Sequence, residues 1–337
     1  MLLHRTRLAY VHLPNLLTDA KRDRTARVYG YVQLWLAEEL LLLFLQEGEV
    51  VNATMSADGR RFRTLPIAEA LASVPGAAEF GEVCFHQCED EQLAAMYISQ
   101  TSEPLAWPPE LNAGDAVAVL GFLHSTMHDG VVEVRSDSGV HYGVSRNGRV
   151  VRGYFSDEPI PPPGVAPGGV PRVAQGVAQG VAPGGAPAER LAEVIAAARS
   201  SREPVEVRLW PVPPPLMVQA PPALIAAYRD LMRATIARLV EHGATGAAAV
   251  AEHARLQLAA RHPSLYAFAG PSPGRDPIVS TEALTAAAGA WLVELLWAAA
   301  PGDGTNPGRL LGDAMRDRRH LFQSAGLSEA LPWKLEW

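Results

Sequence analysis

The first half of the chain alternates between short apolar runs of strand length and segments whose apolar residues recur at helical spacing. In order, this pattern predicts a strand over residues 8–12, a helix over 13–20, strands over 27–37, 40–45 and 49–55, a helix over 66–72 and a strand over 82–86. Gly48 separates two of the strands, and glycine is the residue that a tight hairpin with positive φ requires. The pattern therefore predicts an antiparallel meander that carries helices.

The same order of elements recurs about 100 residues later. Gly30 and Gly48 correspond to Gly130 and Gly148 without a gap. The second set comprises a helix over 113–124, strands over 131–135, 140–145 and 149–155, a helix over 191–196 and a strand over 206–210. Because a repeat at a fixed offset indicates a duplicated structural unit, we expect two copies of one αβ unit.

The offset grows from 100 to 124 residues before the last helix and strand of the second copy, because Ile67 corresponds to Leu191 and Val83 to Val207. A stretch rich in proline and glycine at about 159–187 accounts for the difference. Proline removes hydrogen-bond donors and glycine raises the entropy cost of ordering, so we expect a disordered insertion that forms neither helix nor ladder. Deletion of residues 161–183 should leave folding intact. An ordinary interdomain linker and a polyproline-like docking segment remain the alternatives.

From residue 221 onward the apolar residues fall at helical spacing, in four segments separated by glycine and proline. This predicts a small helical bundle. The predicted fold class is therefore α+β, with two tandem repeats of a small antiparallel-sheet-plus-helix unit followed by an all-α bundle. The expected domains are 1–100, 101–216 and 217–337.

The first repeat resembles the PATAN domain family. The resemblance is carried by leucines in the opening helix, turn glycines and a valine-rich strand: Leu13, Leu16, Leu17, Gly30, Phe44, Gly48, Val50, Val51, Ala53, Ala70, Leu71 and the segment 80–85. The second repeat matches more weakly, through Gly130, Gly148, Val150 and Val151. The resemblance implies a non-enzymatic interaction domain of bacterial signalling or polarity systems, and it supplies no catalytic residues. The residues after 216 resemble no family that we know.

Two histidine patterns are the clearest candidates for chemistry. Cys84, His86 and Cys88 alternate along a predicted strand, and thiolates with an imidazole are good zinc ligands. A structural zinc site needs a fourth ligand, however, so half-buried strand residues are the favoured interpretation. His124 and His128 lie four residues apart without the glutamate of a metalloprotease motif. We expect no catalytic, cofactor or metal site.

Two charged runs have simpler interpretations. The acidic run 89–91 is expected to be a solvated turn, and residues 316–320 are expected to form an exposed helix face with local ion pairs. An anion-binding or acidic-partner patch is the alternative for the second run.

Composition narrows the class of protein further. The net charge of −7 argues against a general nucleic-acid binder. The first residues lack a secretory signal, the most apolar run at 40–45 is too short to span a membrane, and two cysteines suggest a reducing compartment. We therefore expect a bacterial protein of the cytoplasm, without a transmembrane segment.

The C-terminal tail supplies the candidate interaction residues. Trp333, Leu335 and Trp337 would lie together in an extended tail, and tryptophan is enriched at interface hot spots. The alternative is that the tail packs back on the bundle. The favoured function is a non-enzymatic adaptor or scaffold that binds protein partners and could form homo-oligomers. A structural subunit of a larger complex and an enzyme with a site between the αβ part and the bundle are the alternatives.

Overall fold

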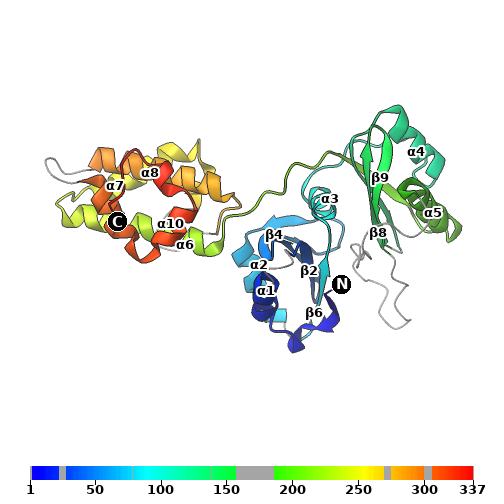
Figure 1. Ribbon diagram of the computed structural model, residues 1–337, viewed down its shortest axis with the longest axis horizontal. Coiled ribbons are helices and arrows are strands. Elements are labelled where there is room, and N and C mark those ends of the chain that lie inside the picture. The colour runs from blue at the N-terminus through cyan, green and yellow to red at the C-terminus, as the bar shows by residue number, and fades with distance from the viewer. Residues whose placement is uncertain are drawn as a thin grey trace. The chain divides into compact units, whose positions relative to one another are not determined.

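The computed structural model describes residues 2–22, 28–77, 79–137, 139–156, 186–268, 275–299 and 306–336. The chain divides into two units, one made of Met1–Leu65 and Ala72–Leu216, the other of Pro66–Leu71 and Met217–Trp337. The described residues form two antiparallel sheets with helices around them, which confirms the α+β class (Figure 1). Most of the predicted insertion at 159–187 lies outside the described residues.

The first sheet has the strand order β1-β6-β2-β3-β4-β5. Its strands are β1 (Leu3–Arg7), β2 (Gly30–Leu36), β3 (Glu39–Gln46), β4 (Glu49–Ser56), β5 (Arg63–Leu65) and β6 (Glu82–Gln87). Helix α1 (Leu13–Arg22) precedes β2 in the chain, and α2 (Ile67–Ser73) lies between β5 and β6. The central strand β3 is buried on both faces, because its run of leucines leaves no polar side for solvent.

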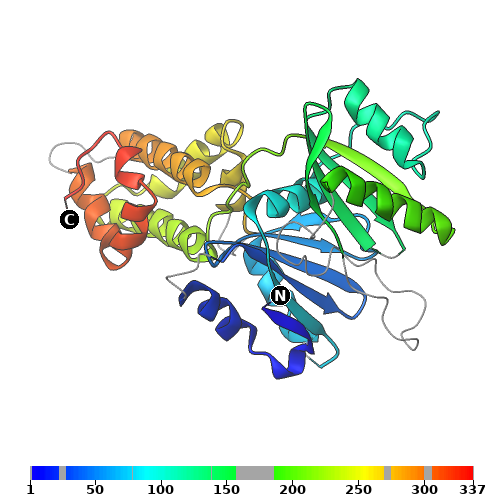
Figure 2. The same cartoon turned by 45° about the vertical axis from the view of Figure 1, so that its right-hand side comes forward.

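The second sheet has the strand order β10-β7-β8-β9. Its strands are β7 (Gly130–Ser136), β8 (Gly139–Arg146), β9 (Arg149–Tyr154) and β10 (Glu206–Pro211). Helix α4 (Ala116–Ser125) precedes β7, and α5 (Pro187–Ser200) precedes β10. Both α4 and α5 cover one face of this sheet, as Figure 2 shows, around an apolar core to which Val119, Leu123, Leu191 and Ile195 contribute.

The two sheets share their strand register. Gly30 pairs with Leu45 on β3 and Gly130 pairs with Ser145 on β8, and the pairing of β3 with β4 and of β8 with β9 shifts register directly before Leu45 and Ser145. A Cβ on Gly30 would lie 2.1 Å from the carbonyl oxygen of His86, and a Cβ on Gly130 would lie 2.0 Å from that of Trp210. Glycine is therefore required at both positions by the close approach of the neighbouring strand.

Helix α3 (Asp90–Thr101) joins the two sheets into one unit. Its side chains share a core cluster with residues of both sheets, among them Tyr31 and Phe44 of the first and Val131 and Tyr142 of the second. Leu93 and Met96 of α3 are completely buried. The helix thus fills the space between the sheets, with one side toward each.

Two sequence-based predictions are wrong in detail, and two elements are not predicted. Residues 8–12 form no strand, because the chain turns in a 3₁₀ helix at Leu8–Tyr10 and the edge strand lies earlier, at Leu3–Arg7. The pattern also predicts neither β5 nor α3. The acidic run 89–91 is not simply a solvated turn, since Asp90 and Glu91 occupy the first turn of α3, where the helix dipole favours negative charge.

The second unit is helical. Its main helices are α6 (Pro222–Glu241), α7 (Ala247–Ala259), α8 (Thr281–Ala299) and α9 (Pro307–Met315), followed by the short α10 (Arg319–Ser324). They pack around one core of leucine, alanine and aromatic side chains, in which the indole Nε1 of Trp291 donates a hydrogen bond of 2.9 Å to the carbonyl oxygen of Ala251. Among the described helices, only α8 is long and apolar enough to cross a membrane, and half of its residues are buried in the protein.

Candidate protein-interaction site

The cysteine and histidine side chains of β6 lie against each other. Cys84 Sγ lies 2.8 Å from His86 Nε2, and the two residues are 2% and 1% exposed. Cys88 is not part of this pair, and burial, together with Asp90 and Glu89, raises the pKa of its thiol to about 12. No group of three or more metal-binding side chains occurs among the described residues. A thiol and a neutral imidazole that are shielded from solvent are typical of packing residues.

A second buried polar cluster lies between α3 and the second sheet. Arg135 Nε is 3.3 Å from Glu133 Oε1, and the hydroxyls of Ser99 and Tyr142 are 3.1 Å apart. Burial raises the pKa of Glu133, although the positive charge of Arg135 acts in the opposite direction. Because Glu133 is only 1% exposed, this carboxyl group is not accessible to a substrate in the folded protein.

The histidines at 124 and 128 do not converge on one site. His124 is exposed at the end of α4, whereas His128 is buried and its carbonyl oxygen accepts hydrogen bonds from Gly148 N and Ser145 Oγ, at 3.1 and 2.9 Å. Burial lowers the pKa of His128. The residue therefore anchors the hairpin turn of the second sheet.

The tail residues with a predicted docking role lie against the helical unit. Leu335 is buried in its core, and Trp333 is partly buried with its ring 6.1 Å from that of Trp297. Trp337 lies outside the described residues. Gly312 allows this packing, since a Cβ there would lie 1.8 Å from the carbonyl oxygen of Glu336. Partner docking through the tail stays a prediction, for which Trp297, 71% exposed, offers a neighbouring surface.

The charged run at 316–320 makes local ion pairs. Arg316 pairs with Asp313, and Arg318 Nη1 lies 2.6 Å from Asp230 Oδ2. The acidic residues before and at the start of α3 are also paired, since Arg152 Nη1 lies 2.6 Å from Glu89 Oε2. Both charged runs therefore hold neighbouring elements together.

The exposed surfaces of α1 and α4, the first helix of each αβ half, differ in character. Each glycine turn locates the matching helix: a Cβ on Gly48 would lie 2.3 Å from the carbonyl oxygen of Ala20 in α1, and one on Gly148 would lie 2.6 Å from that of Leu123 in α4. The two helices are each ten residues long, and each lies against the glycine turn of its own sheet.

The two helices differ in the character of their exposed residues. The exposed positions of α1 include Asn15, Thr18 and Lys21, so its outer side is polar. Helix α4 has the sequence AVAVLGFLHS, without an acidic residue, a lysine or an arginine. Its exposed positions are Val117, which is 80% exposed, Gly121, and the polar His124 and Ser125 at its end. A surface helix normally places polar residues toward solvent, and an apolar outer face is typical of a site that a partner covers.

Several neighbours extend this surface, which we call the α4 face and define as Val117, Ala118, Leu120, Gly121 and Phe122. Val117 and Gly121 are one helical turn apart, and no atom lies within 4 Å of a Cβ placed on Gly121. Phe122 is half-buried, and its ring stands edge-on to that of Trp107 at 5.2 Å. The α4 face is therefore open around Gly121 and firmly supported beneath Phe122.

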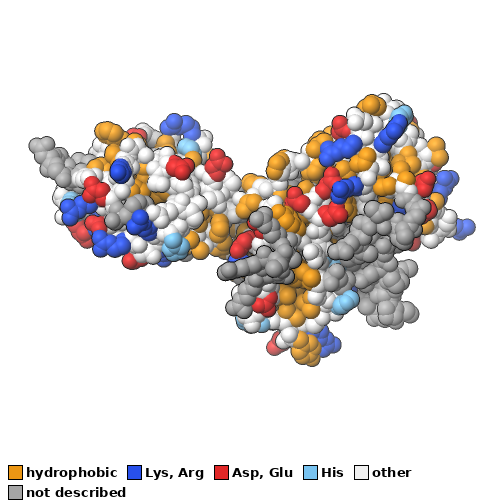
Figure 3. Space-filling model, in the orientation of Figure 1, with side chains coloured by type: hydrophobic (Ala, Val, Ile, Leu, Met, Phe, Trp, Pro, Cys, Tyr) orange, Lys and Arg blue, Asp and Glu red, His pale blue; other side chains and the backbone are white. Residues whose placement is uncertain are grey.

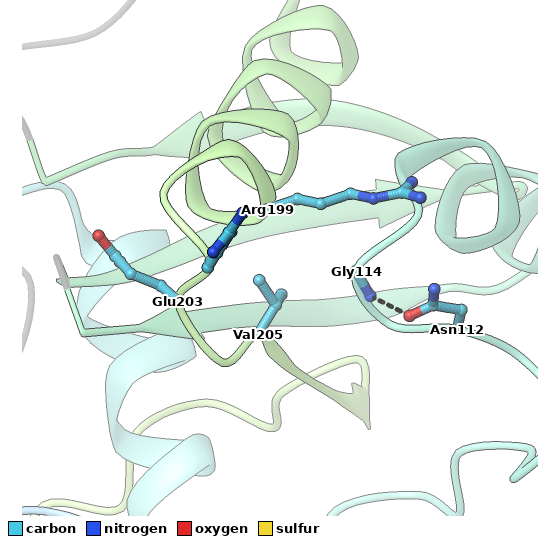
Figure 4. A pocket seen from close by; sticks show the side chains of 6 residues that line it. Asn112, Gly114, Arg199, Glu203 and Val205 are labelled. Carbon is cyan, nitrogen blue, oxygen red and sulfur yellow. Dashed lines mark hydrogen bonds between the residues drawn. The ribbon is translucent and has the colours of Figure 1, made fainter.

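A pocket of about 290 Å³ lies at the end of the α4 face where the helix begins. It is lined by Asn112 and Gly114 of the loop before α4 and by Arg199, Arg202, Glu203 and Val205 from the end of α5 and beyond, so one carboxylate and two guanidinium groups border it. In Figure 4 the side chain of Arg199 extends from α5 across to this loop, where Gly114 N donates a hydrogen bond of 2.9 Å to Asn112 Oδ1. Neither arginine side chain has a hydrogen-bond or ion-pair partner among the described residues.

Figure 3 shows apolar side chains exposed together with arginine side chains on the half of the unit that carries α4. The sequence predicts a helix over 113–124 but gives no direct sign that its outer side is exposed, because an uncharged apolar helix is normally a buried one. The useful signal is the comparison with α1, the polar helix that lies against the corresponding glycine turn of the first sheet.

Comparisons with known proteins identify no relative of this chain. No protein-family model matches the chain, and no curated protein or solved structure is significantly similar to it. The resemblance to PATAN domains stays a prediction from the residues that carry it.

Proposed function

We propose that this protein is a non-enzymatic bacterial adaptor or scaffold of the cytoplasm, which binds protein partners in a signalling, polarity or assembly system. The observation that carries the proposal is the α4 face, an apolar helix surface with Val117 80% exposed. An uncovered apolar surface costs free energy in water, which a partner protein would remove by covering it.

The repeated topology supports this interpretation. We infer that the two αβ halves are tandem copies of one unit, since their strand order and register agree around Gly30 and Gly130. The helix outer face is polar in the first copy and apolar in the second. Such a difference between copies is what recruitment of one copy for binding would produce. The resemblance of the first copy to PATAN domains agrees with an interaction role.

Site-specific photo-crosslinking tests the proposal. A photoreactive phenylalanine analogue replaces Val117 of α4 in one variant and Thr18, exposed on the outer face of α1, in the control. Each variant is expressed in the cell of origin and irradiated, and adducts are identified by mass spectrometry. We expect a discrete adduct with another protein from position 117 and none from position 18.

The outcomes separate the alternatives. Equal labelling at both positions, or a chain recovered as a monomer without adducts, would contradict the adaptor proposal. A single partner recovered in fixed ratio and inseparable from the chain would instead indicate a structural subunit of a complex.

A further inference from the structure

We propose that the segment that docks on the α4 face is an amphipathic helix of a partner protein, with an acidic side chain placed to reach Arg199 and Arg202. This inference rests on the proposed function and names the chemistry of the partner.

The shape of the surface favours a helix. Helix α4 has ten residues and is about 15 Å long, which matches about three turns of a partner helix. Val117 and Gly121 are one turn apart on the same side, and the space above Gly121 is open. A residue without a side chain at the crossing point lets two helix backbones approach closely. The partner helix would place apolar residues at helical spacing over Val117 and Leu120.

The charges near the surface specify the partner further. Arg199 and Arg202 line the pocket at the beginning of α4 and have no side-chain partner among the described residues. A guanidinium group binds a carboxylate with two parallel hydrogen bonds, which gives geometric selection as well as attraction. An aspartate or glutamate on the partner helix, one or two turns from its apolar stripe, would occupy this pocket.

The same charges argue against two other occupants. In a second copy of the chain, α4 would offer no carboxylate to the arginines, because its ten residues contain none. An anionic lipid surface is normally bound by clusters of about four to eight basic residues, whereas α4 carries no lysine or arginine, and the chain has a net charge of −7. An amphipathic helix with an acidic residue can cover the apolar α4 face and pair with Arg199 and Arg202 at the same time.

A peptide selection on the full chain tests the inference. The probe is a display library of 18-residue, helix-stabilised peptides with one randomised face, and binding of enriched peptides is measured by fluorescence polarisation. We expect the enriched sequences to share an apolar stripe at i, i+3 or i+4, and i+7 together with an aspartate or glutamate.

Variants of the chain locate the binding. Val117→Lys is expected to raise the Kd of enriched peptides by about tenfold or more, because it places a charge at the centre of an apolar contact. The double variant Arg199→Ser with Arg202→Ser is expected to raise Kd by about three- to tenfold at low salt, and less at 0.5 M salt because ions screen the charges. Thr18→Lys, at the corresponding exposed face of α1, is the control and should leave Kd unchanged.

Several results would overturn the inference. These are enriched peptides that bind in an extended form, enriched peptides without an acidic residue, and a Kd that is the same in wild type and the Val117→Lys variant. If Val117→Lys lowered the unfolding midpoint, Gly121→Gln would replace it as the disrupting variant. Concentration-dependent dimerisation abolished by Val117→Lys would assign the face to a second copy, and binding to phosphatidylserine vesicles abolished by the same change would assign it to a membrane.

Failure of this inference is distinguishable from failure of the proposed function. A cellular adduct at position 117 whose linked segment is not helical would leave the adaptor function standing and contradict the helix proposal. If acidic helical peptides are enriched but no cellular adduct forms at position 117, the surface binds such helices, and the proposed adaptor function is contradicted.

Discussion

His86 shows how a single side chain in the αβ unit couples folding to pH. Its ring stacks on that of Tyr31 with centroids 4.9 Å apart, and its Nε2 contacts Cys84 Sγ. Burial, with a smaller contribution from the charge of His4, lowers the pKa of His86 to about 4. The imidazole is therefore neutral in the folded protein at neutral pH.

This depressed pKa predicts a loss of stability in mild acid. In the unfolded chain a histidine has a pKa of about 6.5, so between pH 6.5 and 4 the unfolded state binds a proton that the folded state does not. The free energy of unfolding should therefore fall as pH falls through this window, by up to about 3 kcal/mol from His86. Urea unfolding at pH 7 and pH 4.5 measures the difference.

The matched variant is His86→Phe, which keeps an aromatic ring against Tyr31 but cannot be protonated. Its loss of stability between pH 7 and pH 4.5 should be smaller than that of the wild type. An identical loss in both proteins would mean that other groups carry the pH dependence.

At the scale of elements, α3 joins the two sheets of the αβ unit, and it is a helix that the sequence pattern does not predict. Helix α3 buries residues on both of its sides, including Gln92 and Gln100 as well as Leu93 and Met96. A helix covered by a sheet on each side has no polar face, so the one-sided apolar stripe that identifies a surface helix does not occur. The acidic residues at its start then look like a turn, although they are favourable at a helix N-terminus.

The strands of the two central hairpins are predicted better because a local signal bounds them. Gly48 and Gly148 have φ of +80° and +71°, and each lies in the turn of a hairpin that the sequence locates correctly. Strand β5 has only three residues and depends on pairing with β4. No local sequence pattern therefore predicts it. The α4 face could not be predicted from its own residues, since apolarity indicates burial unless the matching helix α1 is known to be polar outside.

The position of α3 predicts that the two sheets lose stability together. Leu93→Ala should lower the free energy of unfolding by about 2–5 kcal/mol, because the completely buried side chain leaves a cavity. Hydrogen exchange followed by mass spectrometry should show a similar loss of protection in β2 and β7. The matched change Leu256→Ala, at a position 52% exposed on α7, should cost less than about 1 kcal/mol. Loss of protection confined to one sheet would mean that the sheets fold separately.

At the scale of the whole molecule, each unit draws its core from its own part of the chain. The core cluster of the helical unit uses residues from Ala220 to Leu335, whereas the clusters of the αβ unit described above end at Leu216. The segment between them, at 212–218, contains neither helix nor strand. This supports a boundary near 216, as the change from strand to helix pattern predicts, rather than one in the proline- and glycine-rich stretch.

The boundary predicts that the two units fold without a covalent link. A protease site inserted between Leu216 and Met217, cut in the purified protein, should yield two fragments that each unfold cooperatively, as followed by circular dichroism after their separation. The fragment 217–337 is the informative one, because residues 66–71 group with this unit although they lie in the other fragment. If 217–337 unfolds cooperatively alone, its own core is sufficient, as the cluster from Ala220 to Leu335 indicates. If it unfolds only in the presence of fragment 1–216, residues 66–71 belong to its folding unit, and a peptide of residues 60–75 should restore the transition.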